Sequence, residues 1–488
     1  MTGKRGKPSG KPTGKRGQPT GKPTGQPSGK PTGKLPFPDA ALVAYGKAHP
    51  GTGLTIGVVL ELEGPPPGRR QLDASLRPVA ELLGTGPSDG GPWTGADGNA
   101  KAAPERGLTD VAHEALARPL EPHRWSCSTV AGLPGGTSAL VWRADHRLLD
   151  GAGVVGVLAA LTGALGPGAH GPGAHGPGAL GPDAHGPDAL GPGAHGLGAH
   201  GPGAATASPA RAEPWRARGA LHRAVTDPLR AAWLCGTPLL ERRRGSAAEA
   251  AGDPPATLSY ACAETDLGLL RGIARRHGTT VNDVYLAALS GALRAQPQLH
   301  GHDGQMRALV PVNVRGPGDA AVLRNRHIPL RIPLPVAEPD AGRRLTLVAA
   351  RTAGRARALR HPLVRAVFRS VPAVAGGWCF ERYFDPGRAT LLASNVRGPS
   401  SPLVVAGRRV LRILPLNFLP AGHRLSTVLA TAQGRAVAGF TTTEPRSAAE
   451  SFAAAWLGEL RVLATAGPWG RSQAAGVDAT ASPAASAR

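Results

Sequence analysis

The chain has 488 residues and a formal net charge of +23 at pH 7, from 56 Lys and Arg against 33 Asp and Glu. Its 69 Gly and 49 Pro are about twice as frequent as in an average protein. Outside two segments rich in these residues, Leu, Val and Ala recur with the spacing of helices and strands, which excludes a fibrous or wholly disordered protein. A chain of this length can bury a large core and suggests roughly two to three domains.

Residues 1–34 form a basic tail built from repeats such as Gly21-Lys22-Pro23-Thr24-Gly25. The tail contains nine Lys or Arg and no acid, and it has almost nothing apolar to bury, so we expect it to be disordered. No apolar segment follows its charges, so it does not resemble a secretory signal. No uncharged apolar run in the chain reaches the roughly 18 residues of a transmembrane helix. The four cysteines form no Cys-x-x-Cys pair, which disfavours a disulfide scaffold and agrees with a cytoplasmic location.

The first half of the chain contains two strong strand patterns. Thr52–Glu63 is apolar and β-branched, as in a buried strand, and Ser138–Ala144 alternates between apolar and polar residues. The second strand continues directly into the loop Asp145–Gly151. The apolar, Ala-rich segment Ala152–Leu165 then predicts a helix that leads away from this loop.

Residues 166–205 consist of eight pentads of the Gly-Pro-Gly-Ala-His kind, whose recurring prolines block a regular helix. We interpret them as a flexible linker or a surface insertion. Weak metal binding by their histidines is an alternative, but histidine ligands need a fixed geometry that such a segment does not supply. These histidines are His170, His175, His185, His195 and His200.

Beyond about Ala212 the pattern is again that of a folded domain. Asp266–His277 predicts a helix with Asp266 as its N-cap and Gly278 as its stop signal. We also expect a buried helix and several buried strands, at Thr280–Arg294, Arg307–Arg315, Ala389–Asn395 and, in two parts separated by Gln433-Gly434, Leu425–Thr442. Helices interspersed with strands in both halves predict an α/β or α+β fold with two lobes of similar size.

The strongest candidate for chemistry is the loop that holds His146, Asp150 and Gly151. A histidine at the end of a buried strand is a good general base, because its neutral form accepts a proton near neutral pH. Asp150, four residues later, can hold the loop through ionic and hydrogen-bond contacts, and Gly151 permits a backbone conformation that a Cβ atom would hinder. The alternative is a histidine that only ends a strand.

This loop resembles the His-x-x-x-Asp-Gly signature of the chloramphenicol acetyltransferase-like superfamily of CoA-dependent acyltransferases. Further segments between about residues 35 and 465 resemble one branch of it, the bacterial wax ester synthase/diacylglycerol acyltransferases. In chain order these segments are Pro38-Asp39-Ala40-Ala41, Thr55-Ile56-Gly57-Val58, Leu133-Pro134-Gly135-Gly136, Thr280–Ala287, Pro311-Val312-Asn313-Val314-Arg315 with Asn325, and Ser394-Asn395-Val396-Arg397-Gly398-Pro399. Each is weak alone, whereas the ordered set is fairly specific.

The resemblance implies a two-lobed fold with the active-site channel between the lobes. It implies transfer of a fatty acyl group from acyl-CoA to an alcohol or diacylglycerol, with His146 as the general base and Asp150 orienting the loop. No metal or other cofactor is implied, because acyl-CoA is a substrate. The sequence departs from the family at two positions, where Asp145 replaces the usual first histidine and Arg397 replaces a usual proline.

Three further residues are candidates for positioning the base or the acyl carbonyl, namely Asn282, Asp283 and Asn395. For Asn282 and Asp283 the competing interpretation is a helix start, since Asn and Asp cap helices well. The expected domains are a disordered tail at 1–34, an N-terminal lobe with the histidine loop at 35–165, a linker or insertion at 166–212, a C-terminal lobe at 213–466 and a disordered tail at 467–488.

Eight arginines and no acid lie between Arg343 and Arg369, interleaved with apolar residues, which predicts a basic amphipathic helix. The arginines either form a solvated face or contact an anionic membrane, a lipid droplet or the phosphates of CoA. Binding of polyanions through the tail is the non-enzymatic alternative, although nucleic acid is disfavoured because the tail lacks aromatic residues for base stacking.

Three other enzymatic interpretations remain. A condensation-type or specialised-metabolite O-acyltransferase would use an acyl group bound to a carrier. The histidine loop also resembles that of dihydrolipoyl acyltransferases, but the body of the chain has no lipoyl-bearing Asp-Lys-Ala segment. The segment Gly151–Gly156 satisfies the Gly-x-Gly-x-x-Gly pattern of dinucleotide sites, yet it follows an acidic loop and lacks the rest of that motif.

Overall fold

The computed structural model describes residues 37–84, 106–163, 258–299, 305–316 and 322–467, together with Leu229 and Asp319. All of these lie in one compact unit that begins at Pro36. The basic tail, the pentad repeats and the chain after residue 467 lie outside the described residues, so the expectations for them and for the domain boundaries stay predictions.

The first half of the described chain contributes a mixed set of helices and strands. They are α1 (Phe37–Ala48), β1 (Thr55–Leu62), α2 (Arg69–Leu83), α3 (Leu108–Ala117), β2 (Trp125–Leu133), β3 (Thr137–Asp145) and α4 (Gly151–Leu161). The strands predicted around residues 52–63 and 138–144 are therefore confirmed as β1 and β3, and the predicted helix after the loop is α4.

The second half begins with β4 (Ser259–Asp266), α6 (Leu267–His277), α7 (Val281–Arg294), β5 (Met306–Asn313) and β6 (His327–Leu334). It continues with α8 (Ala341–Thr352), α9 (Arg355–Leu359), α10 (Pro362–Ser370), α11 (Ala373–Phe384), β7 (Leu391–Arg397), β8 (Val404–Val405), β9 (Arg408–Leu416), β10 (Leu425–Ala432), β11 (Arg435–Thr442) and α12 (Arg446–Thr465). The predicted helices and strands of this half are confirmed. The N-cap is confirmed too, because the Asp266 side chain accepts a hydrogen bond from the Gly268 N–H.

The basic segment is not one helix. Ala353 is the C-cap of α8, Gly354, with φ of 67°, is the N-cap of α9, and Pro362 starts α10. Glycine adopts this left-handed conformation at little cost, and proline cannot continue a helix that precedes it. The arginines of residues 343–369 are therefore divided among three short helices and the turns between them.

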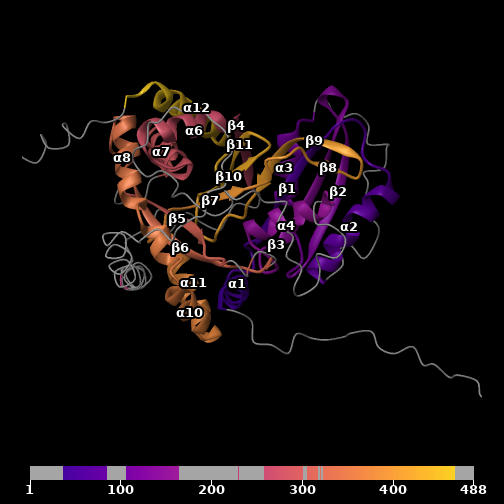
Figure 1. Ribbon diagram of the computed structural model, residues 1–488, viewed down its shortest axis with the longest axis horizontal. Helices are drawn as coiled ribbons and strands as arrows, with labels where there is room; N and C mark the ends of the chain where they lie inside the picture. The colour runs from indigo at the N-terminus through magenta and orange to yellow at the C-terminus, as the bar shows by residue number, and fades with distance from the viewer. Residues whose placement is uncertain are drawn as a thin grey trace, which may run out of the picture. The chain divides into compact units, whose positions relative to one another are not determined.

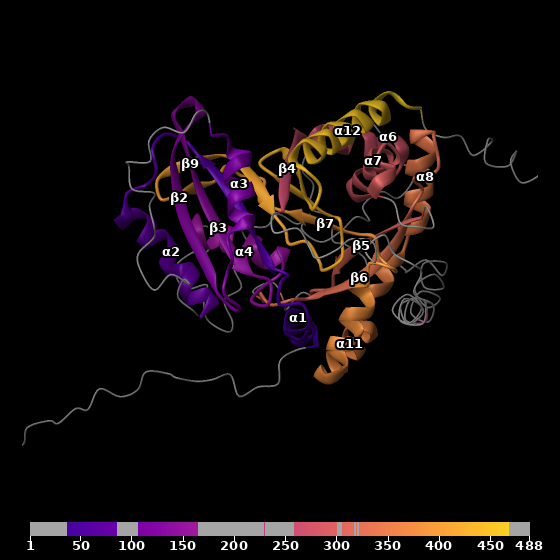
Figure 2. The same ribbon diagram turned by 180° about the vertical axis from the view of Figure 1, so that it is seen from behind.

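Among the described residues the strands form two sheets, ordered β2-β3-β1-β9-β8 and β4-β11-β10-β7-β5-β6. Figure 1 and Figure 2 show the first sheet, mainly indigo and magenta, beside the second, whose strands run from rose (β4) through orange to yellow. The orange β9, from the second half of the chain, pairs with β1 and completes the first sheet, with Gly57 opposite Leu416. This mixed helix and sheet architecture in two lobes is the predicted fold class.

In the described part of the chain, three hydrophobic clusters form the core, and the two around the first sheet also include residues from the second. Residues of β1 are buried on both faces, because Val58 and Leu60 pack into one hydrophobic cluster while Val59 packs into another under α3. This two-sided burial explains why β1 is apolar throughout rather than alternating. On the second sheet, α6, α7, α8 and α12 supply a third cluster in which α7 is buried along most of its length.

The two sheets meet where β9 passes β4 and β11. The Tyr260 hydroxyl donates to the Pro415 carbonyl oxygen at 2.9 Å. A Cβ atom on Gly439 would lie 2.9 Å from that same oxygen, so glycine is required for this close approach. These contacts hold one end of β9 against the second sheet, although β9 pairs only with strands of the first sheet among the described residues.

Candidate active site at the junction of the two sheets

His146 lies in the turn that follows β3, at the end predicted from the sequence. Its backbone N–H donates to the Leu54 carbonyl oxygen at 2.8 Å, which anchors the turn to the chain just before β1. The ring is surrounded by aromatic groups from the second half of the chain. Its centroid lies 5.4 Å from the Phe418 ring and 6.0 Å from the His327 ring. His146 Nδ1 is enclosed and has no hydrogen-bond partner within the part of the chain that the structure describes.

Asp150 joins the histidine loop to the second half of the chain. Its side chain caps α4 by accepting from the Gly153 N–H at 3.0 Å. Both carboxylate oxygens also bind the Arg315 guanidinium, at 2.8 and 2.9 Å, in a bidentate pair whose side chains are only 7% and 8% exposed. The Arg326 backbone N–H adds a fourth bond at 3.0 Å. Asp150 is thus a structural link between lobes as well as a cap.

The other side of the loop is held by Asn325 and Asp39. The Asn325 amide donates to the His146 carbonyl oxygen at 3.0 Å and to Asp39 Oδ1 at 2.9 Å. Both side chains are fully buried. The sequence placed these residues in motifs without assigning them a contact, and the structure brings them together around the backbone of His146.

Asp145, which replaces the family's usual first histidine, binds Arg147. Its carboxylate accepts from the Arg147 N–H at 2.8 Å and from the Arg147 guanidinium at 3.0 Å. A Cβ atom on Gly46 would lie 1.8 Å from that guanidinium, so the glycine in α1 leaves room for it. Burial raises the pKa of Asp145 above its usual value, although Arg147 opposes this. In this structure the departure from the family forms a buried local ion pair.

His327 is a functional candidate that the sequence analysis missed. It begins β6, and its Nδ1 lies 3.7 Å from Asp150 Oδ2. The ring therefore faces both the catalytic candidate His146 and the carboxylate that links the lobes. The only signal for His327 in the sequence was its position two residues after Asn325. That signal could be used only if the contact of Asn325 with the histidine loop was already known.

Burial and neighbouring charges keep the His146 imidazole neutral, and neighbouring charges keep the Asp150 carboxylate ionised. Burial, and then the charge of His327, lower the pKa of His146 from 6.5 to about 4. The Asp150 pKa is held well below its usual value by His327 and Arg315, although burial acts to raise it. At neutral pH the loop accordingly contains a neutral imidazole beside a carboxylate.

The three predicted positioning residues lie on the second sheet and α7. The Asn395 amide donates to Asn282 Oδ1 at 3.3 Å, and among the described residues these two contact one another rather than the ring of His146. Asp283 forms a capping box with Thr280 and accepts from the Thr352 hydroxyl at 2.6 Å. Both of its oxygens are thereby occupied in fixing the start of α7.

The glycines after Asp150 serve close packing between lobes. A Cβ atom on Gly151 would lie 2.7 Å from Val396, and one on Gly153 would lie 2.6 Å from the Leu323 carbonyl oxygen. Gly156 is similarly close to Leu323. Their spacing matches the dinucleotide pattern, but in this fold they allow α4 to approach the second half of the chain.

The described residues lack two features that other classes of site require. No group of three or more His, Cys, Asp or Glu side chains there is arranged to hold a metal ion. In the same part of the chain, no helix combines the length and the apolar character needed to cross a membrane.

Two segments of the chain match models of one protein family. Residues 100–285 match the wax ester synthase/diacylglycerol acyltransferase catalytic domain, and residues 312–450 match the C-terminal domain of the same family. The two matches contain the His146 loop and the Arg315–Asn325 segment that binds it. The chain belongs to the wax ester synthase/diacylglycerol acyltransferase family.

Individual relatives agree with this assignment. A probable diacylglycerol O-acyltransferase of Mycobacterium tuberculosis is 31% identical over 181 residues, which are 35% of this chain and 38% of the relative. The match thus spans well under half of that relative's length. A second protein of M. tuberculosis, a putative diacylglycerol O-acyltransferase, is 29% identical over 181 residues, 35% of this chain and 39% of its own.

Solved structures show the same fold at low sequence identity. The wax ester synthase/diacylglycerol acyltransferase of Marinobacter aquaeolei aligns with a TM-score of 0.50 at 16% identity, over 88% of this chain and 98% of that one. The starter condensation domain of rhizomide synthetase aligns with a TM-score of 0.53 at 12% identity, over 88% and 94% of the two chains. The family fold is therefore shared with condensation domains.

Proposed function

We propose that the protein is an acyl-CoA-dependent O-acyltransferase that transfers a fatty acyl group to an alcohol or diacylglycerol, with His146 as the general base. The observation that supports this proposal most directly is the position of His146. Its loop is held on one side by the Asp150 and Arg315 pair and on the other by the Asn325 and Asp39 pair. These contacts hold a neutral imidazole at the junction of the two lobes, where a donor and an acceptor can meet.

In the proposed reaction the free nitrogen of the His146 ring accepts the proton of the acceptor hydroxyl. Since Nδ1 is enclosed, we assign this role to Nε2. The hydroxyl oxygen attacks the thioester carbonyl, the carbon–sulfur bond breaks, and the CoA thiolate leaves and takes up the proton. The products are an ester and CoA, and no covalent enzyme intermediate is required.

The roles of the remaining residues follow from their contacts. Asp150 orients the loop and does not relay protons, because its oxygens are engaged by Arg315, Gly153 and the Arg326 N–H. We propose that the Asn282–Asn395 pair positions the acyl carbonyl. The family and the names of the relatives support diacylglycerol as an acceptor class. The starter condensation domain was solved in complex with C8-CoA, which agrees with a thioester donor in this fold.

Release of the CoA thiol from palmitoyl-CoA, measured with a panel of alcohols and diacylglycerol, tests this function. The His146→Ala variant is the control, and we expect it to lose about 10²- to 10⁴-fold in rate. Its fold should persist, because the contacts of His146 with Leu54 and Asn325 use the backbone. Turnover near that of the wild type in this variant would exclude His146 as the base.

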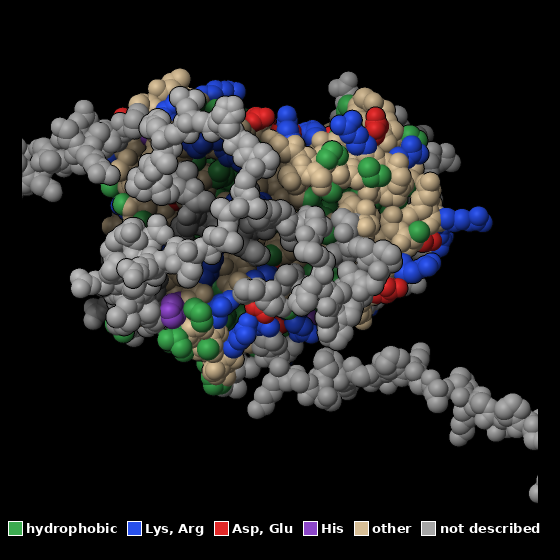
Figure 3. Space-filling model, viewed as in Figure 1, with side chains coloured by type: hydrophobic (Ala, Val, Ile, Leu, Met, Phe, Trp, Pro, Cys, Tyr) green, Lys and Arg blue, Asp and Glu red, His purple; other side chains and the backbone are tan. Residues whose placement is uncertain are grey.

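We also propose that α10 and α11 contact an anionic membrane or lipid droplet. Leu363 and Val367 of α10 are 59% and 68% exposed, and Trp378 of α11 is 57% exposed. Figure 3 shows hydrophobic and basic side chains side by side over these helices. Apolar side chains next to arginines suit the interface of an anionic bilayer.

Vesicle binding tests this contact. We expect Leu363→Ser with Val367→Ser to weaken binding to anionic vesicles, because apolar insertion is lost while every charge remains. Val462→Ser is the matched control, since Val462 is 51% exposed on α12. Equal binding by the control and the double variant would assign vesicle attraction to charge elsewhere, including the basic tail.

A further inference from the structure

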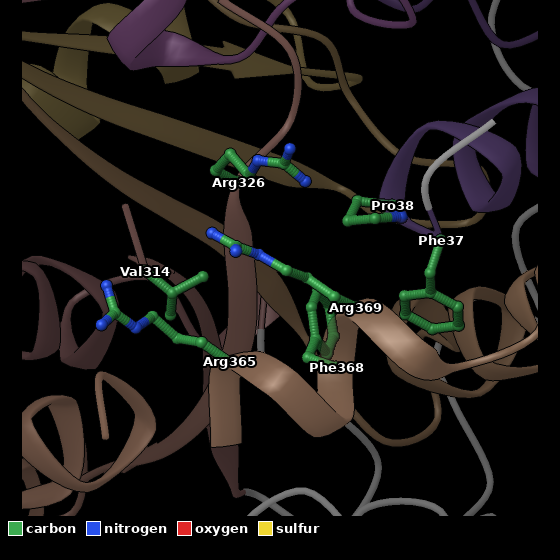
Figure 4. A pocket seen from close by; sticks show the side chains of 7 residues that line it. All are labelled: Phe37, Pro38, Val314, Arg326, Arg365, Phe368 and Arg369. Atoms are coloured by element: carbon green, nitrogen blue, oxygen red, sulfur yellow. The ribbon is translucent and has the colours of Figure 1, made fainter. Parts of the chain in front are cut away.

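A pocket of about 250 Å³ lies between the start of α1, the end of β5 and α10. Figure 4 shows the side chains of Arg326 and Arg369 across it, with Val314 and Arg365 at one end and Phe37 and Pro38 at the other. The Phe37 and Phe368 rings meet edge to face at 4.9 Å and form an apolar wall. The pocket thus combines three guanidinium groups with an aromatic surface.

The positive charge of this pocket exceeds its negative charge. The Asp319 carboxylate interacts with the charges of all three arginines, and it binds Arg369 at 2.8 Å and the Gly316 N–H at 3.0 Å. Burial would raise the pKa of Asp319, but the Gly316 bond and the charges of Arg369, Arg326 and Arg365 hold it below its usual value. One carboxylate therefore faces three cations.

One donor in the pocket lacks a partner among the described residues. Arg326 Nε is buried and forms no hydrogen bond with any of them. A buried donor without an acceptor costs free energy, and an anion in the pocket would remove that cost. Arginine suits phosphate in particular, because its planar fork can donate two parallel hydrogen bonds to two oxygens.

The pocket also adjoins the histidine loop. The Arg326 backbone N–H binds Asp150, and its neighbours in the chain, Asn325 and His327, contact His146. A ligand at the Arg326 side chain would therefore lie one residue from the contacts that hold the base.

We propose that this pocket binds the phosphate group of a phosphate ester, with the adjoining part of the ligand against Phe37 and Phe368. Arg326, Arg365 and Arg369 supply the donors. Its volume accommodates a phosphate and a few neighbouring atoms rather than a whole coenzyme. Assigning that phosphate to the acyl-CoA donor rests on the proposed function, whereas phosphate binding as such does not.

Calorimetric titration of the full chain with CoA, glycerol 3-phosphate and inorganic phosphate tests the proposal. We expect Arg365→Gln and Arg369→Gln each to weaken the tightest of these interactions about tenfold, because each removes a charge-assisted bond. Arg271→Gln, an exposed arginine of α6, is the matched control and should bind as the wild type does. The basic tail is present in all variants, so its contribution cancels.

The ligands distinguish the sources of the phosphate. If CoA binds most tightly, the pocket is assigned to the thioester donor. If glycerol 3-phosphate binds most tightly, the pocket is assigned to a lipid headgroup. If inorganic phosphate binds as tightly as the other two, the pocket is assigned to the free ion. Arg369→Lys keeps the charge that faces Asp319 and should lose less affinity than Arg369→Gln, which keeps the test valid if the latter unfolds.

Equal affinities for all three Gln variants, or the absence of saturable binding of every probe, would overturn the proposal. Because binding is measured without turnover, these outcomes are independent of the acyl-transfer assay. A chain that binds phosphate in this way but forms no ester would contradict the proposed function and leave the pocket intact.

Discussion

At the scale of single residues, the ionisation of His146 depends on groups that reach it from the other lobe. His327, Asp150, Arg315 and the Arg326 backbone all converge on the loop. Because burial and the charge of His327 lower the pKa of His146 to about 4, the imidazole stays neutral well below pH 6.5. A general base must be neutral to act, so the activity should persist into moderately acidic solution.

Replacing His327 should move the acid limb of the pH–rate profile. Without the neighbouring charge, the pKa of His146 rises from about 4 toward 6.5, and the rate at low pH falls at a higher pH than in the wild type. We expect this for both His327→Ala and His327→Gln, measured as kcat/KM against pH. An acid limb that stays in place in both variants would show that His327 does not act on His146 through charge.

Asp150→Asn should lower the free energy of unfolding as well as activity. It leaves the Arg315 guanidinium, 8% exposed, without its carboxylate, and breaking a buried pair typically costs about 3–5 kcal/mol. Asp73→Asn is the matched control, because Asp73 pairs with Arg69 at the surface at 3.9 Å and such pairs contribute about 0–1 kcal/mol. Denaturant unfolding beside kinetics checks both. Reduced activity with unchanged stability would instead place Asp150 in the chemistry itself.

At the scale of elements, the position of α4 depends on its glycines, which have no side chain and allow close contacts. Asp150 caps its first turn, and Gly153 lies against Leu149 and the Leu323 carbonyl oxygen from the second half of the chain. A helix rich in glycine is intrinsically weak. Here tertiary packing compensates for the low helix propensity. Glycine at positions 153 and 156 lets α4 approach Leu323, which lies in the connection between β5 and β6.

Gly153→Ala should therefore destabilise the protein, by about 1–3 kcal/mol, because the new Cβ atom would lie 2.6 Å from a backbone oxygen. Gly272→Ala in α6 is the control, since nothing lies within 4 Å of a Cβ atom there. Helix propensity alone should make the control neutral or up to about 1 kcal/mol more stable. Thermal unfolding of both variants measures the difference. A stabilised Gly153→Ala variant would mean that α4 moves away from Leu323 at no cost.

At the scale of the whole molecule, buried histidines make stability depend on pH. His423 is 3% exposed. Burial lowers its pKa from 6.5 to about 4, and the carbonyl of Ala421 only partly opposes this. The unfolded chain binds the proton first as pH falls, so the stabilisation is complete above about pH 6.5 and is lost progressively toward pH 4.

Unfolding free energies of His423→Asn between pH 7 and pH 4 test this dependence. We expect a flatter profile than that of the wild type, by up to about 3 kcal/mol across this range, since one pKa unit corresponds to about 1.4 kcal/mol. A profile of His423→Asn that runs parallel to that of the wild type would show that His423 does not control acid unfolding.

The sequence by itself determined the local structure. The apolar runs predicted β1 and β3, the caps at Asp266 and Gly278 fixed the ends of α6, and the spacing of His146, Asp150 and Gly151 identified the loop. These features depend on neighbours a few residues apart, which periodicity and capping rules describe directly. The ordered motifs also indicated the family.

Only the tertiary structure decided what surrounds His146. Asp150 and Arg315 are 165 residues apart, and Asp39 and Asn325 are 286 apart, so no local pattern couples them. The insertion of β9 into the first sheet, the contact of His327 with the loop and the three arginines of the pocket arise in the same way. Contacts of this kind form when the chain packs two cores against each other, and their partners are selected by the fold rather than by adjacent residues.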